Sequence, residues 1–372
     1  MDPVPLALSV CGVLFLISWI SYSLHYFFHA WVTPTPRDLK KLYDAEWALV
    51  TGGSSGIGLA LCDILCSQGI NVFIVAKDDP LIGQSTKELK KKYPDRDIRA
   101  LGVDLGDRNG GYLSKIEKQT KNLRINLIFN NAGYIRVGLF PDDPVDAALH
   151  NMEVNVTSSL RITHLFANRL LDRGEKGVIG FTSSSSCFIP CPMSAMYGAT
   201  KAFLTHFATS LAAEVRPSGI QVLVIHPSPV NSNFYSDTRG LGAMESARKT
   251  AVSAETVAKS ILSSVGRTVI KDQGYFTVGA RLLLKVLDLN LFADIAAAGI
   301  GLAGDYWKLK KDRNPEKKER MMNKSDVLRK NMFHAARIPF SEFDSTWRHF
   351  GCTARQQNRS ALQVDEVASL IR

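Results

Sequence analysis

Short apolar segments alternate with longer stretches of helical spacing from Trp47 onward. The apolar segments are WALVT, NVFIVA, IRALGV, NLIFNN, VIGFT and IQVLVIH. Strands separated in this way favour a parallel sheet, because each parallel pair needs a long crossover connection. Gly69 and Gly219 follow two helical stretches, where a left-handed residue commonly ends a helix. We therefore predict an α/β fold with a doubly wound parallel sheet.

The first predicted strand runs directly into the loop TGGSSGIG. Gly52, Gly56 and Gly58 permit a tight turn and a close approach of the backbone to a phosphate. We expect a helix to begin near Leu59, and the unpaired N–H groups at its start would attract an anion. The loop therefore predicts a pyrophosphate cradle at the first strand of a Rossmann fold.

The N-terminal part has no charged residue between Asp2 and Arg37. The apolar stretch 5–32 exceeds the ~20 residues needed to cross a bilayer, so we predict a membrane anchor over residues 1–36. A cleaved signal peptide is the alternative, but it would carry a basic start and a small-residue cleavage site. Trp31, Tyr26 and two histidines suit the interfacial end, and Lys40 and Lys41 beyond it predict a cytosolic catalytic part.

The formal net charge of +10 is concentrated near the end of the chain. Residues 308–337 hold eleven Lys or Arg against four Asp or Glu. We predict a basic tail over residues 308–372, either solvated and disordered or bound as a polybasic patch to an anionic membrane. Because the basic residues are confined to a tail, nucleic acid is not an expected partner.

The six cysteines are too few and too scattered for a disulfide-stapled domain, which favours a reducing compartment. Their two Cys-x-x-x-Cys pairs lack the spacing and nearby histidines of a zinc site. No metal site is expected.

Several further motifs follow the glycine loop in a fixed order. They are Asp104 after the third strand, NNAG at residues 130–133, Asn155 in the next helix, and the YxxxK pair Tyr197 and Lys201. With the GxxxGxG spacing of the loop, this set resembles the short-chain dehydrogenase/reductase family over roughly residues 45–305. We place the corresponding domain at residues 45–307.

Helical geometry puts residues i and i+4 on one face, so Lys201 is expected near the Tyr197 phenol. Positive charge from Lys201 and an oxidised nicotinamide would favour the phenolate, making Tyr197 a usable acid or base. The resemblance implies that a serine thirteen residues earlier, Ser184, orients the substrate, with Ser183 as the alternative. It also implies that Asn155 holds a water that relays protons past Lys201.

The end of the second strand decides the expected cofactor. Lys77 stands where NAD-preferring relatives carry an acidic residue, which favours NADP(H) over NAD(H), although Asp78 and Asp79 follow closely. The resemblance implies cofactor contacts from Thr51, Gly52, Ser54, Ser55, Gly56, Ile57, Gly58, Lys77, Asp104, Asn131, Ala132, Gly133, Tyr197, Lys201, Pro227, Val230 and Ser232. The loop after the sixth strand departs from the family pattern, because Ser228 replaces a glycine and Ser232 a threonine.

Residues 233–304 are expected to form a substrate lid. Their apolar stretch IAAAGIGLAG predicts either a buried core helix or a lipid-facing or acyl-lining surface. Among membrane-anchored relatives, the chain resembles the very-long-chain 3-oxoacyl-CoA reductase and 17β-hydroxysteroid dehydrogenase group, and also the 3-ketodihydrosphingosine reductases.

This resemblance implies reduction of a ketone on a lipid-type substrate, at the endoplasmic reticulum membrane, by a single-pass protein with Tyr197 as general acid. A homodimer is left open. The alternative function is a catalytically silent, membrane-tethered nucleotide-binding scaffold, which would be expected to lack one of Tyr197, Lys201, Ser184 or Asn155.

Overall fold

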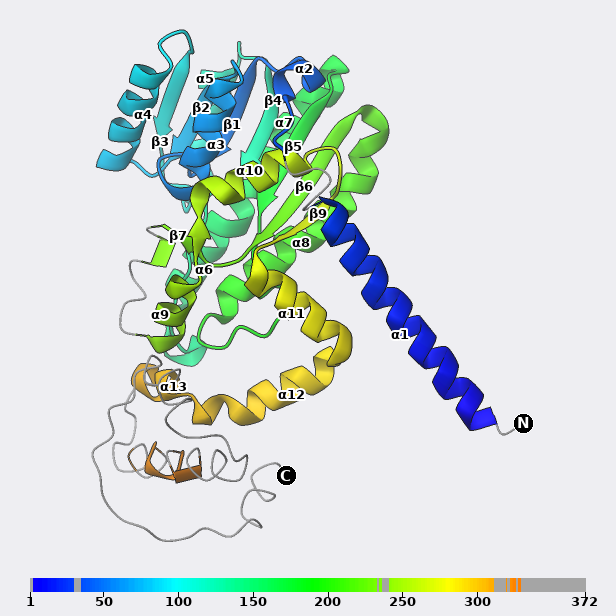
Figure 1. The fold of residues 1–372 in the computed structure, drawn as a ribbon. Helices are drawn as coiled ribbons and strands as arrows, with labels where there is room; N and C mark the ends of the chain where they lie inside the picture. Colours follow the sequence, from blue (N-terminus) through cyan, green and yellow to red (C-terminus); the bar gives the residue numbers. More distant parts are fainter. Residues whose placement is uncertain are drawn as a thin grey trace.

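A parallel sheet of seven strands forms the centre of the protein, in the order β3-β2-β1-β4-β5-β6-β9 (Figure 1). The computed structural model describes residues 3–29, 35–232, 234–235, 241–310, 319, 322–325 and 327–328. The predicted doubly wound fold is confirmed. The strands are β1 (Trp47–Thr51), β2 (Asn71–Ala76), β3 (Ile98–Gly102), β4 (Ile125–Asn130), β5 (Gly177–Thr182), β6 (Ile220–Pro227) and β9 (Ile270–Gln273).

Helices cover both faces of this sheet, and alternate residues of each strand serve the two cores. In β1, Ala48 and Val50 pack into one core and Trp47 and Leu49 into the other. This alternation follows from the period of two along a strand. The first core receives α3 (Gly56–Ser67), α4 (Pro80–Lys92) and α10 (Ala254–Ser264), and the second receives α5 (Gly111–Thr120), α7 (Ser158–Arg173) and α8 (Ala195–Val215).

The strand order reverses between β1 and β4, so their carboxyl ends open side by side. Loops that leave neighbouring strands in opposite directions create a crevice for ligands at this edge. Helix α3 begins at Gly56, three residues earlier than the sequence predicted, because Ser55 is already the extended N-cap residue. The remaining helix at this edge is α6 (Val145–Met152).

The region predicted as a substrate lid contributes to the sheet as well. Strand β9 pairs in parallel with β6, and helix α10 packs on α3. The sequence IKDQ gave no strand prediction because Lys271, Asp272 and Gln273 are polar, yet all three are buried. The other elements of this region are β7 (Val230–Asn231), α9 (Gly242–Lys249), β8 (Val252–Ser253), α11 (Tyr275–Val286), α12 (Leu289–Gly299) and α13 (Gly304–Leu309).

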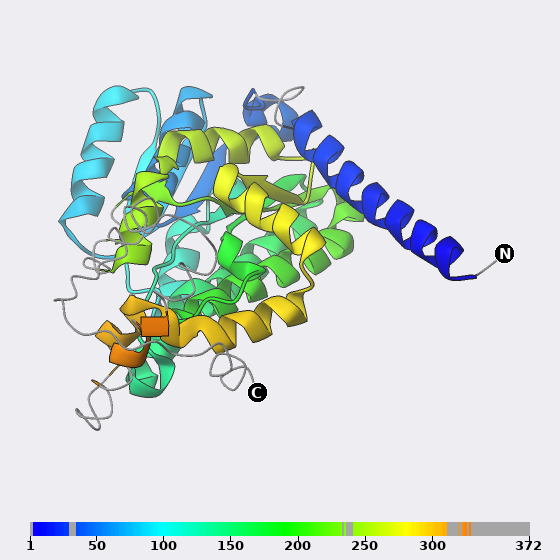
Figure 2. The ribbon, with the colours of Figure 1, turned by 60° about the horizontal axis from the view of Figure 1, so that its bottom comes forward.

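Helix α12 corrects one of the two interpretations of the apolar stretch near residue 295. None of its residues is buried, so the buried core helix is wrong. Its position beside α11 at one end of the molecule leaves the alternative of an exposed apolar surface (Figure 2).

The N-terminal helix α1 (Pro3–Phe27) projects from the domain (Figure 1). Its segment Leu8–Phe27 has a mean hydropathy of 1.6 and is long and apolar enough to cross a membrane. A short helix α2 (Leu39–Tyr43) follows it and packs into the first core. Most of the predicted basic tail, residues 308–372, and Trp31 lie outside the described residues.

A buried charge cluster joins β6, β9 and α11. The Asp272 carboxylate accepts a hydrogen bond from the Arg281 guanidinium at 3.0 Å, and His226 Nδ1 lies 2.7 Å from its other oxygen. Burial opposes the charge on Asp272, but the hydrogen bonds from His226 and Arg281 hold its pKa well below the ordinary value. Burial likewise opposes a charged His226, yet the bond to Asp272 raises its pKa.

We predict that Asp272→Asn destabilises the protein by about 3 kcal/mol, because it leaves a buried cation without its partner. The depressed pKa of Asp272 stabilises the fold above pH ~4, and this contribution is lost as pH falls. The raised pKa of His226 stabilises the fold below pH ~6.5, and this contribution is lost as pH rises. Urea unfolding of the detergent-solubilised chain from pH 3 to 9 measures both effects.

The matched control is Asp146→Asn, because Asp146 pairs with Arg108 on the surface, where its side chain is 83% exposed. A screened surface pair contributes ~0–1 kcal/mol. Equal stability losses in the two variants would contradict the structural role of Asp272.

Candidate active site

The β1–α3 loop forms a tight turn that favours glycine at three positions, because Gly56 has a left-handed φ of +53° in addition to the constraints on Gly52 and Gly58. Gly52 has a φ of +65°, and a Cβ on it would lie 3.0 Å from Ala132 Cα. A Cβ on Gly58 would lie 2.2 Å from the Gly52 carbonyl oxygen, so a side chain there would break the packing of α3 on the loop. A Cβ on Gly56, in contrast, would meet only Ser232, at 3.4 Å. The loop therefore has the shape of a phosphate cradle, with Ser54, Ser55 and Ile57 within it.

Thr51 ties this loop to the NNAG turn that leaves β4. Its Oγ1 accepts hydrogen bonds from the backbone N–H groups of Asn131 and Ala132, both at 2.9 Å. The Asn131 amide donates back to the Thr51 carbonyl at 3.2 Å and accepts from the Thr182 hydroxyl at 3.1 Å. The carboxyl ends of β1, β4 and β5 are thus fixed relative to one another.

Of the two acidic residues near the predicted cofactor-selecting position, Asp79 is engaged by a helix cap and Asp78 is exposed. Asp79 caps α4 by accepting from the Leu81 N–H at 3.0 Å, and Asp78 lies against Gly102, whose Cβ would come within 2.6 Å of its carboxylate. Lys77, directly after β2, is exposed. Asp104 is exposed at the end of β3, where its Oδ1 accepts from the Gly106 N–H at 2.8 Å.

Helix α8 brings Tyr197 and Lys201 to the same edge of the sheet. The Lys201 ammonium donates to the Thr182 carbonyl at 2.8 Å and lies 5.6 Å from the centroid of the Tyr197 ring. Burial lowers the pKa of Lys201 to about 8. Burial also raises the pKa of the Tyr197 phenol, whereas the sequence led us to expect a lowered value. In the protein alone, desolvation of the phenol outweighs the interactions that would lower its pKa.

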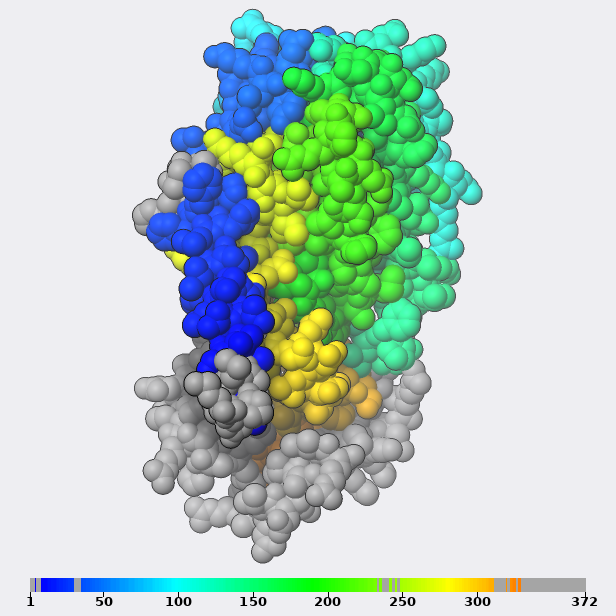
Figure 3. All heavy atoms as spheres, turned by 90° about the vertical axis from the view of Figure 1, so that its right-hand side faces the viewer, coloured from blue at the N-terminus to red at the C-terminus, as the bar shows by residue number. Residues whose placement is uncertain are grey.

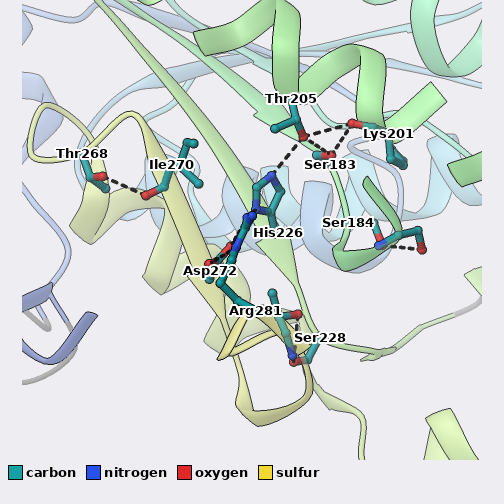
Figure 4. Close-up of polar contacts among 12 residues, drawn as sticks. Ser183, Ser184, Lys201, Thr205, His226, Ser228, Thr268, Ile270, Asp272 and Arg281 are labelled. Atoms are coloured by element: carbon teal, nitrogen blue, oxygen red, sulfur yellow. Dashed lines mark hydrogen bonds and ion pairs between the residues drawn. The ribbon is translucent and has the colours of Figure 1, made fainter. Parts of the chain in front are cut away.

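The two candidate serines have different partners (Figure 4). Ser183 is buried, and its hydroxyl is bonded to the Lys201 carbonyl and to Thr205 Oγ1, both at 2.8 Å. Ser184 lies 3.1 Å from Ser186 Oγ and is less buried. A hydrogen bond from Ser184 acts to lower the pKa of Tyr197, against the larger effect of burial. Ser184 is therefore the serine that faces Tyr197.

Asn155 lies in a π-helical turn, Glu153–Thr157, between α6 and α7. Its Oδ1 accepts from the Tyr134 N–H at 3.0 Å, and its Nδ2 donates to the Tyr134 carbonyl and to Thr200 Oγ1, both at 3.1 Å. A Cβ on Gly133 would lie 3.0 Å from Asn155 and 3.3 Å from the Lys201 ammonium. Asn155 therefore joins the NNAG turn to α8; its predicted water relay stays a prediction.

The contacts of Ser228 explain why the loop after β6 departs from the family pattern. Ser228 Oγ accepts from the Thr277 N–H at 3.1 Å, so the serine that replaces a glycine holds the start of α11. Pro227 ends β6 and Val230 lies in β7, paired with β8. Ser232 packs against Gly56 and thus reaches the glycine loop.

Sequence reasoning missed Thr205 and His226, which lie behind the site. Thr205 Oγ1 is 3.0 Å from His226 Nε2 and donates to the Lys201 carbonyl at 3.0 Å. The sequence offered a weak clue, because His226 is a polar residue that follows the apolar run 222–225 of β6. Its partner Asp272 is 46 residues away along the chain, so no local pattern could pair them.

Comparison with known proteins places this geometry in context. The family model "short chain dehydrogenase" matches residues 46–240, just over half of the chain. A very-long-chain 3-oxoacyl-CoA reductase of Ajellomyces capsulatus is 30% identical over 60% of this chain and 64% of its own length, less than two thirds. The Mus musculus protein of the same name is 30% identical over 66% of this chain and 76% of its own length.

Solved structures share the fold. A short-chain dehydrogenase from Sphingobium yanoikuyae in complex with NADPH has a TM-score of 0.54 and 24% identity, over 61% of this chain and 87% of that one. A 7β-hydroxysteroid dehydrogenase has a TM-score of 0.61 and 21% identity, over 69% and 98%. With the glycine loop, the NNAG turn and the Tyr197–Lys201 pair at one edge of a parallel sheet, the chain belongs to the short-chain dehydrogenase/reductase family of oxidoreductases.

Proposed function

We propose that the protein reduces a ketone on a lipid-type substrate with NADPH. One observation carries this proposal: Tyr197 and Lys201 of α8, Ser184 after β5, and Asn155 of the π-helical turn come from three separate segments and meet beside the glycine loop. Asn155 and Lys201 both approach the Cα of Gly133 in the NNAG turn. A silent scaffold would have no need to bury the Lys201 ammonium there, because burying a charge is costly.

The chain's own residues supply the proton and the charge stabilisation. Tyr197 stays protonated near neutral pH because burial raises its pKa, so it can act as the general acid toward the oxygen of the ketone. The Ser184 hydroxyl donates to the negative charge that develops on that oxygen. Lys201 binds the cofactor ribose, and Asn155 positions the NNAG turn. When bound, the cofactor supplies the hydride.

NADP(H) is the proposed cofactor, in preference to NAD(H). The Lys77 side chain is exposed, and the nearby Asp79 carboxylate is bonded to the start of α4 instead. The Lys77 ammonium therefore suits the extra phosphate on the ribose. Thr51, Gly52, Gly56 and Gly58 form the cradle for the pyrophosphate. Further proposed contacts come from Ser54, Ser55, Ile57, Asp104, Asn131, Ala132, Gly133, Tyr197, Pro227, Val230 and Ser232.

The proposed substrate and location rest on the relatives and on α1. Relatives named very-long-chain 3-oxoacyl-CoA reductase support a 3-oxoacyl-CoA; 3-ketosphinganine and a ketosteroid are the other candidates. Because α1 is long and apolar enough to cross a bilayer, we place the protein in the endoplasmic reticulum membrane as a single-pass protein. The basic residues that follow α1 support a catalytic part on the cytosolic side.

Removing the Tyr197 hydroxyl tests the catalytic assignment. We predict that Tyr197→Phe lowers kcat for NADPH-dependent ketone reduction about 100-fold or more, because the general acid is lost. NADPH binding, followed by fluorescence, should be retained. Tyr93→Phe, at the residue that follows α4, is the matched control and should keep full activity. Equal turnover in Tyr197→Phe would refute the assignment, and a native protein inactive on all three ketones would favour the scaffold.

The cofactor preference is tested at Lys77. We predict that Lys77→Ala raises KM for NADPH about 10-fold or more, because a charge-assisted hydrogen bond to the ribose phosphate is lost. KM for NADH should change little. Lys118→Ala, an exposed lysine on α5, is the control and should leave both values unchanged. An equal rise in KM for NADPH and for NADH would contradict the recognition of the ribose phosphate by Lys77.

The lowered pKa of Lys201 predicts a pH dependence. As pH rises through about 8 the ammonium loses its proton, so kcat/KM for NADPH should fall on the alkaline side of that value. A Lys201→Arg variant keeps its charge at high pH, so any residual activity should lose this alkaline limb. A native kcat/KM that stays flat up to pH 10 would contradict the role of the Lys201 charge.

A further inference from the structure

Helix α11 has its apolar face turned outward. Its exposed residues are Tyr275, Phe276, Gly279, Leu283 and Val286, which repeat at helical spacing and include no charge. A surface helix of a soluble domain normally shows the opposite arrangement, with charged residues outside.

The charged residues of α11 are directed toward other parts of the chain instead. Arg281 bonds to the buried Asp272 at 3.0 Å, and the Lys285 ammonium donates to Ser18 Oγ of α1 at 2.9 Å. The outward face of α11 is thus left to its apolar and aromatic residues.

Helix α12 continues this surface. We call the combined surface the α11–α12 face; it consists of Tyr275, Phe276, Leu283, Val286, Leu289, Leu291 and Ile295, which are 50% to 93% exposed. Two exposed carboxylates, Asp288 and Asp294, lie in the same segment at the start and middle of α12. Exposed apolar residues gathered on neighbouring helices mark a contact with a protein or a membrane.

Helix α1 packs next to this face, which indicates what covers it. Besides the Ser18–Lys285 bond, the Tyr22 hydroxyl donates to Asp272 at 2.9 Å, and the Lys285 ammonium lies over the Tyr22 ring. The end of α1 that is nearer the domain contacts α11, and from there α1 projects away from the domain (Figure 1, Figure 3). The hydrogen bonds of Ser18 and Tyr22 thus fix the level along α1 at which the domain contacts this helix.

That position fixes the depth of the face. Ser18 lies nine residues before Phe27, or ~13 Å along the helix axis. Ser18 also lies near the middle of Leu8–Phe27, the segment that is long and apolar enough to cross a membrane, because the ten residues from Leu8 to Ile17 span ~15 Å before it. A bilayer crossed by α1 must therefore include the level of Ser18, where Lys285 at the end of α11 meets it.

Residues suited to the lipid headgroups lie just above this level. A cavity of about 230 Å³ between α1, β9 and α11 is lined by Tyr22, His25, Tyr26 and Lys271, among others. Tyrosines and lysines of this kind anchor proteins at the boundary between headgroups and hydrocarbon.

We propose that the α11–α12 face is embedded in the same leaflet that α1 enters, so that the domain contacts the membrane with this face as well as with its anchor. The proposal rests on the proposed membrane anchorage. Because α11 follows β9 at the carboxyl end of the sheet (Figure 1), the edge that carries Tyr197 then faces the lipid. A lipid ketone reaches the site from the leaflet.

Fluorescence quenching in vesicles tests this depth. The full-length chain carries a fluorescent amino acid in place of Leu283 or Leu291 and is reconstituted into phosphatidylcholine vesicles that contain nitroxide-labelled lipid. We expect both probes to lose most of their fluorescence. A probe at Ile17 in α1 reports the anchorage itself. A probe at Leu81 on α4, an exposed leucine far from α1, is the matched control and should not be quenched.

The outcomes separate the two proposals. Quenching at Ile17 without quenching at Leu283 and Leu291 leaves the anchorage intact and overturns the embedded face. If cross-linking then joins two chains through Leu291, the face belongs to a second copy of this protein, and the proposal is equally overturned. No quenching at Ile17 refutes the anchorage and with it the depth argument.

Discussion

The buried ammonium of Lys201 is the contact on which the proposed site depends. It is held by the Thr182 carbonyl at the end of β5, and the backbone carbonyl of Lys201 is held in turn by Ser183 and Thr205. Removing a charge from water is costly unless such partners compensate it. The register of α8 against β5 is therefore fixed, and with it the position of Tyr197 one turn earlier.

A second set of contacts links this site to the N-terminal helix. Thr205 meets His226, His226 meets Asp272, and Asp272 accepts the Tyr22 hydroxyl from α1. These bonds cross from α8 through β6 and β9 to the outside of the domain (Figure 4). The charged groups in this series of hydrogen bonds are buried. The same interactions that lie behind Lys201 therefore also set the positions of α1 and α11.

The arrangement suits a substrate that dissolves in membranes. The carboxyl edge of the sheet, helix α11 and the α11–α12 face lie toward one end of the protein, and α1 contacts α11 before it projects away from the domain (Figure 1, Figure 3). In the proposed orientation, a lipid ketone would not have to leave the bilayer completely to meet Tyr197. The cofactor cradle opens at the same edge, near the switch between β1 and β4.

Local patterns in the sequence determined most of the fold. Six strands were predictable because each is a short apolar run between helices, and the glycine loop was predictable because Gly52 and Gly58 occupy positions where a Cβ would clash. The pair Tyr197 and Lys201 could be found because helical spacing links residues four apart. In each case the physical cause acts between neighbours in the chain.

Tertiary structure alone decided the rest. Strand β9 was missed because its polar residues are buried only through partners far away in sequence, His226 and Tyr22. The choice of Ser184 over Ser183 depends on which of the two hydroxyls is hydrogen-bonded to α8. The direction in which the pKa of Tyr197 shifts depends on how completely the fold excludes water from the phenol. The sequence by itself determined which residues the site contains; their burial and long-range contacts, which no local spacing encodes, decided how those residues are held and which face the protein turns outward.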